Sequence, residues 1–141
     1  MTTHFLFVCT GNSARSQMAE ALLRRRRPEF DVHSAGLEAQ GVNPYTLDVL
    51  GELGIDTSPL VSETVFDYIG KAFRPTYLVT VCARAEKNCP MIWPGQTIRL
   101  HWPFDDPAAA SGSPEHVRAE FRRIRDEIDA RINAFLAAES V

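Results

Sequence analysis

Apolar residues along this chain form two kinds of pattern, and the two kinds alternate. Short runs rich in aromatic and β-branched residues predict strands at residues 4–9, 30–35, 76–82 and 98–102. Apolar residues at three- and four-residue spacing predict helices between and after these strands. Those helices are expected at about residues 17–27, 44–53, 65–69 and 114–141, while residues 83–88 fit either a short helix or a loop.

Residues that start and stop helices agree with this division. Pro28 would end the first helix, and Asn43 followed by Pro44 supplies an N-cap and a proline at the first position of the second helix. Leu47 and Leu50 are expected to point inward from that second helix. Four strands separated by helical segments suggest right-handed crossovers, and therefore an α/β fold with a doubly wound parallel sheet.

Length, composition and charge limit the class of protein. The chain has 141 residues, 45% of them hydrophobic, which suits a single catalytic domain over residues 1–141. A net charge of −3 gives no reason to expect nucleic acid or a membrane surface as a partner, and no apolar run approaches the ~18 residues of a membrane span. Because the chain is acidic, the four arginines at 24–27 fit a helix end better than a nucleic-acid patch. An odd number of cysteines, three, fits thiol chemistry in a reducing compartment, so a cytoplasmic location is expected.

The segment after the first predicted strand carries the clearest chemical signal. It reads Cys-Thr-Gly-Asn-Ser-Ala-Arg-Ser over residues 9–16 and leads into the first helix. The five residues between Cys9 and Arg15 are enough for a loop that curls into a ring, with its N–H groups directed at one small anion. The residues we expect to bind an oxyanion are Thr10, Gly11, Asn12, Ser13, Ala14 and Arg15.

Three features of this loop favour the charged sulfur of Cys9: the N–H donors of the ring, the positive end of the following helix, and the guanidinium of Arg15. We therefore expect Cys9 to be largely a thiolate at neutral pH. Arg15 can grip two oxygens of a tetrahedral oxyanion, and Ser16 is placed to donate a hydrogen bond to the sulfur. The alternative is a purely structural role, with Cys9 buried at the end of a strand and Arg15 solvated. This alternative does not explain the order of strand, loop, arginine, hydroxyl residue and helix.

The other two cysteines form a second constellation. Cys82 ends the third predicted strand, so it shares the carboxyl edge of a parallel sheet with Cys9, and Cys89 follows seven positions later. If the segment between them were helical, the two sulfurs would lie about 10 Å apart along the helix axis, which is beyond disulfide reach. A bond between them therefore requires the segment to unwind. The alternative is that Cys82 is a core residue and Cys89 an incidental loop residue.

A third piece follows the fourth predicted strand, at the same edge of the sheet. It is the sequence Asp105-Asp106-Pro107. A carboxylic acid over the anion loop can protonate a departing oxygen, which otherwise leaves as hydroxide or alkoxide. An acidic turn whose geometry is restricted by proline is the simpler interpretation.

Residues 8–20, Val-Cys-Thr-Gly-Asn-Ser-Ala-Arg-Ser-Gln-Met-Ala-Glu, resemble the signature loop shared by the low-molecular-weight protein tyrosine phosphatases and the thioredoxin-coupled arsenate reductases of the same fold. The resemblance covers nearly the whole chain. It implies three layers, with four parallel strands in the order 2-1-3-4 flanked by helices. It also assigns the role of general acid to Asp106.

Two features resemble the reductases more than the phosphatases. Cys82 and Cys89 match the redox pair that flanks a mobile segment in the reductases, and Ala108 stands where the phosphatases usually have an aromatic residue after Asp-Pro. The resemblance thus implies reduction of arsenate to arsenite through a relay of Cys9, Cys82 and Cys89. It also implies thioredoxin as the reductant and no tightly bound cofactor.

Two other functions remain open from the sequence. A phosphomonoesterase like the tyrosine phosphatases would use Cys9, Arg15 and Asp106, with Cys82 and Cys89 only protecting against oxidation. A thiol sensor or oxyanion-binding regulator without catalytic activity would need Cys9 but not Asp106. Asp106→Asn separates this last class from the two enzymes, because binding should survive while turnover falls.

Relatives of this type can bind a structural potassium ion beside the loop. Three residues of this chain match that pattern, and the fourth position, which is usually aspartate, is a glutamate here. The four are Asn12, Glu20, Ser34 and Glu63. Ordinary hydrogen bonding explains these residues equally well.

Overall fold

A computed structural model describes residues 2–69, 73–89 and 97–139 as strands and helices in alternation. The described elements, in chain order, are β1 (His4–Cys9), α1 (Arg15–Arg26), β2 (Asp31–Gly36), α2 (Pro44–Gly51), α3 (Phe66–Ile69), β3 (Tyr77–Thr80), α4 (Ala83–Asn88), β4 (Ile98–His101), the 3-10 turn η1 (Pro107–Ala109) and α5 (Pro114–Glu139). The predicted elements are all present within these residues, most with ends shifted by one to three positions. The last two residues predicted for the final helix lie outside the described part.

The strands form one parallel sheet in the order β2-β1-β3-β4, which confirms the predicted order. Cys9 pairs with Gly36 at the end of β1, and Thr80 pairs with both Val8 and His101. Because all strands run the same way, their carboxyl ends meet at one edge. That edge carries the segments that follow β1, β3 and β4.

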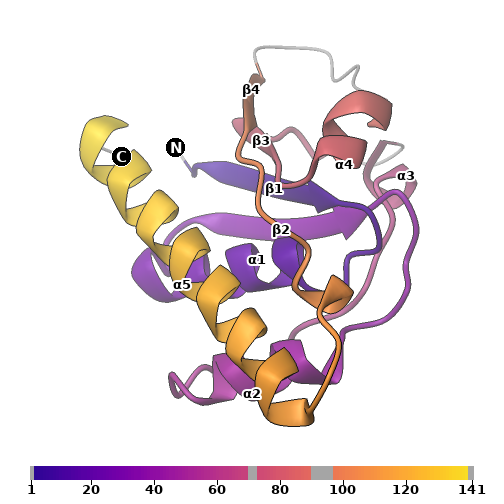
Figure 1. Cartoon of the computed structure of the whole chain (residues 1–141). Helices are drawn as coiled ribbons and strands as arrows, with labels where there is room; N and C mark the ends of the chain where they lie inside the picture. The colour runs from indigo at the N-terminus through magenta and orange to yellow at the C-terminus, as the bar shows by residue number, and fades with distance from the viewer. Residues whose placement is uncertain (1, 70–72, 90–96, 140–141) are drawn as a thin grey trace.

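Helices cover both faces of the sheet, which gives the predicted three layers (Figure 1). Helices α1, α2 and α5 lie on one side, where α5 packs against α1 and α2, and α3 and α4 lie on the other. Arg26, at the end of α1, donates two hydrogen bonds to Asp129 of α5. Arg26 therefore connects the end of α1 to α5.

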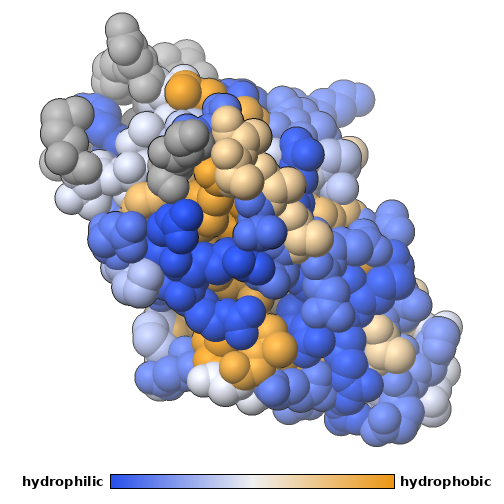
Figure 2. All heavy atoms as spheres, turned by 90° about the vertical axis from the view of Figure 1, so that its left-hand side faces the viewer, coloured by the Kyte–Doolittle hydropathy of each residue, from blue (hydrophilic) through white to orange (hydrophobic). Residues whose placement is uncertain are grey.

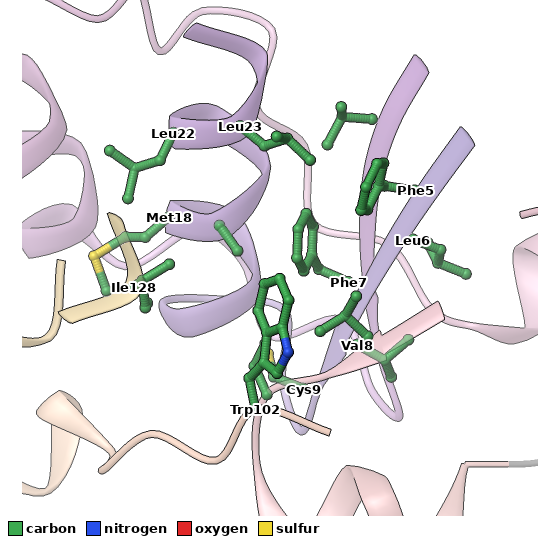
Figure 3. Packing of buried hydrophobic residues seen from close by; sticks show 14 of the residues in the cluster. Phe5, Leu6, Phe7, Val8, Cys9, Met18, Leu22, Leu23, Trp102 and Ile128 are labelled. Atoms are coloured by element: carbon green, nitrogen blue, oxygen red, sulfur yellow. The ribbon is translucent and has the colours of Figure 1, made fainter. Parts of the chain in front are cut away.

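β1 lies at the centre of the core and is buried on both faces. Figure 3 shows Phe5 and Phe7 on the side of β1 that faces α1, while Leu6 and Val8 point to the other side. None of these four side chains is exposed to solvent. This explains why β1 reads as a continuous apolar run rather than as an alternating one.

One face of the molecule is mainly polar. Figure 2 shows this face as mostly hydrophilic, with small separate hydrophobic patches. Within the described residues, no helix is both long enough and apolar enough to cross a membrane.

One expectation about the core is wrong. Leu50 of α2 is fully buried as predicted, but Leu47 is 37% exposed, and the buried stripe of this helix consists of Thr46, Val49 and Leu50. The Thr46 hydroxyl donates to the backbone oxygen of Ser13 in the loop after β1. The inward face of α2 was mispredicted because Thr46 is polar, and the sequence gives no sign that its hydroxyl bonds to the loop after β1.

Candidate active site

The loop between β1 and α1 is held in an unusual backbone conformation. Asn12 has φ of 49°, the one positive φ at a non-glycine position among the described residues. Asparagine tolerates this left-handed conformation better than most residues. A left-handed residue within a loop can help to turn neighbouring N–H groups toward one anion, and the anion-binding ring over residues 10–15 stays a prediction.

The side chain of Asn12 fixes the loop from inside. Its Nδ2 donates to the hydroxyls of Ser16 (2.8 Å) and Ser34 (2.9 Å). Its Oδ1 accepts from the backbone N–H of Glu63 (2.8 Å) and from Nε2 of Gln17 (3.0 Å). Since Asn12 is fully buried, these four bonds tie the loop to three other segments and leave its shape little freedom.

Cys9 lies at the carboxyl end of β1 with its sulfur against α1. Its Sγ is 2.8 Å from Oγ of Ser16, which confirms the predicted contact. The Ser16 oxygen already accepts from Nδ2 of Asn12. The Ser16 hydroxyl hydrogen is therefore available to donate to the Cys9 sulfur.

Arg15 and Asp106 face each other across the loop. The guanidinium of Arg15 donates to the backbone oxygen of Phe104 (3.1 Å) and lies 3.9 Å from Oδ2 of Asp106. Oδ1 of Asp106 accepts from the N–H of Ala108 (3.0 Å) and so caps η1. The other carboxylate oxygen remains directed toward Arg15. Asp105 is mainly solvated, 3.5 Å from Arg123.

These groups line one hollow of about 380 Å³ above Cys9. The lining consists of Cys9, Thr10, Gly11, Ser13, Ala14, Arg15, Gln40, Arg84, Asp106 and Ala108. The predicted nucleophile, arginine and acid therefore share a single polar cavity, large enough for a tetrahedral oxyanion, with all of the predicted anion loop except the buried Asn12. Another hollow, of about 310 Å³ between α1 and residues 54–60, contains none of the predicted catalytic residues.

Gln40 and Arg84 of this lining were not identified from the sequence, and Ala108 was noted there only because it replaces an aromatic residue. Arg84 is the second residue of α4, and Gln40 belongs to the loop after β2. Arg84 adds a second guanidinium to this hollow, and it lies on the helix that separates Cys82 from Cys89. A charged residue directly after Cys82-Ala83 was the available signal, but only the cavity distinguishes it from an ordinary solvated arginine.

Cys82 occupies the start of α4. Its sulfur accepts from the N–H of Ala85 (3.4 Å) and is 3.4 Å from Oγ1 of Thr10. Thr10 directly follows Cys9 in the chain. Cys82 and the anion loop therefore do share one edge of the sheet, as the strand pattern predicted, and all three cysteines are free thiols.

Cys89 occupies the other end of α4. Its N–H donates to the backbone oxygen of Ala85 (2.9 Å) and so completes the last turn of the helix that separates Cys82 from Cys89. Cys89 is buried, 8% exposed. Burial raises the pKa of its thiol to about 11, although the cation of Arg99 acts in the opposite direction.

This raised pKa predicts how Cys89 reacts with iodoacetamide. Near pH 8, about one folded molecule in a thousand should carry a thiolate at Cys89. The alkylation rate of Cys89 should rise about tenfold per pH unit toward pH 11. Because folding stabilises the neutral thiol, burial of Cys89 contributes to the free energy of unfolding below the ordinary pKa of 9.0, and this contribution is lost as the pH rises through 11. Peptide mapping by mass spectrometry measures the rate, with the urea-unfolded chain as control. A midpoint below pH 9 in the folded chain contradicts the burial of Cys89.

Gly36 leaves no room for a side chain beside the anion loop. A Cβ there would lie 2.4 Å from the oxygen of Glu38 and 2.7 Å from the N–H nitrogen of Asn12, both backbone atoms. Gly36→Ala should lower the free energy of unfolding by about 1–3 kcal/mol and weaken binding of inorganic phosphate, because the loop must shift. Urea denaturation and calorimetry measure the two effects. Gly51→Ala is the matched control, since nothing lies within 4 Å of its Cβ position; equal effects of the two substitutions would overturn the prediction.

The four residues proposed for potassium lie close together. Oγ of Ser34 accepts from Nδ2 of Asn12 and donates to Oε1 of Glu20 (2.8 Å). The backbone N–H of Glu63 donates to Oδ1 of Asn12. Burial raises the pKa of the Glu20 carboxyl, which Arg24 at 2.8 Å opposes. Oε1 of Gln17, on the amide that contacts Asn12, is buried and has no hydrogen-bond partner among the residues that the structure describes. A buried carboxylate, a hydroxyl and an orphaned amide oxygen are donors of the type that a hard cation prefers.

The profile of one protein family, described as low molecular weight phosphotyrosine protein phosphatase, matches residues 4–141. Arsenate reductase of Halalkalibacterium halodurans is 46% identical over 130 residues, which cover 92% of this chain and 91% of that protein. Arsenate reductase of Bacillus subtilis is 44% identical over 131 residues, with the same shares of the two chains.

Solved structures agree. An arsenate reductase in its oxidised state superposes with a TM-score of 0.79 at 28% identity, over 97% of this chain and 98% of the other. The thioredoxin-dependent arsenate reductase of Corynebacterium glutamicum gives 0.72 at 29% identity, over 97% of this chain and 61% of that longer one. The chain belongs to the low molecular weight phosphotyrosine protein phosphatase family. Within that family, these relatives are arsenate reductases rather than phosphatases.

Proposed function

We propose that this chain reduces arsenate to arsenite by a relay of three cysteines and is recycled by thioredoxin. One observation supports this most strongly. Cys82 lies beside the anion loop of Cys9, with Thr10 between them at 3.4 Å from the Cys82 sulfur. A phosphatase needs the loop and the acid but no second thiol for its chemistry, whereas a relay requires one at this position.

The first chemical step belongs to the loop. Arsenate binds to the N–H groups of residues 10–15 and to the guanidinium of Arg15. The Cys9 thiolate attacks arsenic, and Asp106 gives a proton to the departing oxygen, which leaves as water. The product is a covalent sulfur–arsenic(V) adduct at Cys9.

Two thiol exchanges complete the turnover. Cys82 attacks the Cys9 sulfur, and the electron pair of the sulfur–arsenic bond stays with arsenic, which leaves as arsenite. Cys89 then attacks Cys82, which frees Cys9 as a thiolate and leaves a Cys82–Cys89 disulfide. Two electrons and two protons from the dithiol of thioredoxin restore both thiols. The second exchange requires α4 to unwind, since a helix holds the two sulfurs apart.

Paired activity assays test this function against the phosphatase alternative. In the presence of NADPH, thioredoxin and thioredoxin reductase, we expect sustained arsenate-dependent NADPH oxidation. Hydrolysis of an aryl phosphate by the same preparation should be far slower, because Ala108 and Ala109 offer no aromatic surface beside the cavity. Rapid aryl phosphate hydrolysis without arsenate-dependent oxidation would show a phosphomonoesterase. Phosphate binding without either activity would show a regulator.

We propose in addition that Asn12, Glu20, Ser34 and Glu63 hold a potassium ion. A cation there would offset the charge of Glu20 and stabilise the turn of Asn12 in the loop. The test is the thermal unfolding midpoint in potassium chloride against sodium chloride at equal ionic strength, for the original chain and for Glu20→Gln. A midpoint higher in potassium, lost in the variant, supports the site. Equal midpoints in both salts exclude it.

A further inference from the structure

Helix α4 is tethered to the sheet mainly by one side chain. It separates Cys82 from Cys89, and Ala85 is the single buried residue among its six. Its apolar contribution to packing is therefore small. Glu86, in contrast, reaches from the middle of α4 to the ends of β3 and β4, which lie beside it in Figure 1.

Three side chains from the strands bind Glu86. Oε1 accepts from Nε of Arg99 (3.1 Å), and Oε2 accepts from the hydroxyl of Thr80. Oε2 is also 3.4 Å from Nδ1 of His101. Arg99 donates a further bond to the backbone oxygen of Glu86 (2.7 Å), so the arginine grips both the side chain and the main chain of α4.

The three strand residues are also ordered among themselves. Oγ1 of Thr80 is 2.9 Å from Nδ1 of His101, and Thr80 is fully buried. Thr80 has one hydroxyl hydrogen, which it donates to Glu86. In the contact between Thr80 and His101, the ring Nδ1–H is therefore the donor and the Thr80 oxygen is the acceptor. Both carboxylate oxygens of Glu86 are thus engaged, one by a guanidinium and one by a hydroxyl and an imidazole.

We propose that Glu86 is a positioning residue for the disulfide exchange: by fastening α4 to Thr80, Arg99 and His101, it stabilises the helical dithiol form and so sets the equilibrium between the thiols and the disulfide of Cys82 and Cys89. This inference rests on the proposed relay. The disulfide can form only when α4 unwinds, and unwinding breaks every contact of Glu86 with the strands. The same unwinding releases Arg99, the cation that favours the thiolate of Cys89.

The contacts of Glu86 should change the reduction potential of the Cys82–Cys89 pair in one direction. The Cys82–Cys89 disulfide takes up two electrons and two protons from a dithiol reductant and becomes two thiols. Contacts present only in the dithiol form make this reduction more favourable. Loss of the Glu86 contacts should therefore make the reduction potential of the pair more negative and speed closure of the disulfide.

Glu86→Gln in full-length protein tests this. Equilibration with dithiothreitol buffers in a Cys9→Ser background isolates the pair, and mass spectrometry counts the fraction oxidised. We expect about a tenfold shift in the equilibrium constant toward the disulfide, which corresponds to about 30 mV. Arg99→Gln should produce a similar shift, and the double variant should add little, because the two residues share one interaction. Lys87→Gln is the control: it removes a charge from an exposed position of the same helix and should leave the potential unchanged.

A second measurement separates this role from a general loss of stability. Hydrogen exchange of the α4 amides should accelerate in Glu86→Gln while exchange in β1 and α1 stays the same. An unchanged potential in Glu86→Gln overturns the proposal, and so does an equal shift in Lys87→Gln. Failure of the relay itself is distinct: the unmodified chain would then form no Cys82–Cys89 disulfide when it is mixed with arsenate.

Discussion

Replacing Asp106 with asparagine should lower kcat/KM for arsenate by about 10²- to 10⁴-fold. The carboxyl group lies at the mouth of the cavity, with Oδ1 fixed by the N–H of Ala108 and Oδ2 directed toward Arg15 at 3.9 Å. Asparagine can keep the first contact but cannot supply a proton to the departing oxygen. Binding of inorganic phosphate should survive, because the loop residues 10–15 are untouched. The rate of arsenite release in a single turnover is the quantity to measure.

Asp105→Asn is the matched control for this substitution. It changes the adjacent carboxylate, whose side chain is 79% exposed and lies 3.5 Å from the guanidinium of Arg123 in α5. Activity should change less than about threefold, as for most solvated surface positions. If both substitutions lower the rate equally, the effect is the local loss of negative charge, and Asp106 is not the acid.

Arg15→Lys should lower kcat/KM for arsenate by about 10²- to 10³-fold. Lysine keeps the positive charge but loses the planar fork that binds two oxygens of the oxyanion at once. It also loses the bond to the oxygen of Phe104, which connects α1 to the segment that carries Asp106. The loss should divide between weaker phosphate binding and slower single-turnover chemistry, measured by calorimetry and by rapid mixing.

Arg25→Lys controls for the arginine-to-lysine change in the same helix. Arg25 is 40% exposed at the side chain and lies 4.0 Å from Asp129, far along α1 from the loop. Its substitution should leave both phosphate affinity and kcat/KM unchanged. An Arg15→Lys protein with activity within threefold of the original would show that charge alone, without the fork, suffices at this position.

The catalytic loop could be predicted from the sequence because its chemistry is local. Cys9, Arg15 and Ser16 lie within eight consecutive residues, so the geometry of a single loop determines their arrangement. The parallel sheet was predictable for a related reason: β1 is buried on both faces and therefore reads as an uninterrupted apolar run. Because parallel strands end at one edge, the proximity of Cys82 to this loop followed from the order of the elements.

What the sequence did not reveal depends on contacts between distant segments. Thr46 faces inward because its hydroxyl meets the oxygen of Ser13, 33 positions away, and an apolar pattern gives no sign of that. The sequence assigned no role to Glu86, which lies in a segment that fitted either a short helix or a loop, yet it binds Arg99 and Thr80 on two strands. Polar side chains of this kind gain their role from tertiary structure, so periodicity cannot distinguish them from solvated ones.

The central claim is that the three cysteines act in sequence, and the most direct test counts arsenite released per chain in the Cys89→Ser protein supplied with arsenate and thioredoxin. The account predicts one arsenite per chain, after which the reaction stops with a Cys9–Cys82 disulfide. Cys82→Ser should release none, because arsenic stays bound to Cys9. Repeated turnover of Cys89→Ser with thioredoxin alone would contradict the account, since Cys9 would then be regenerated without the final exchange.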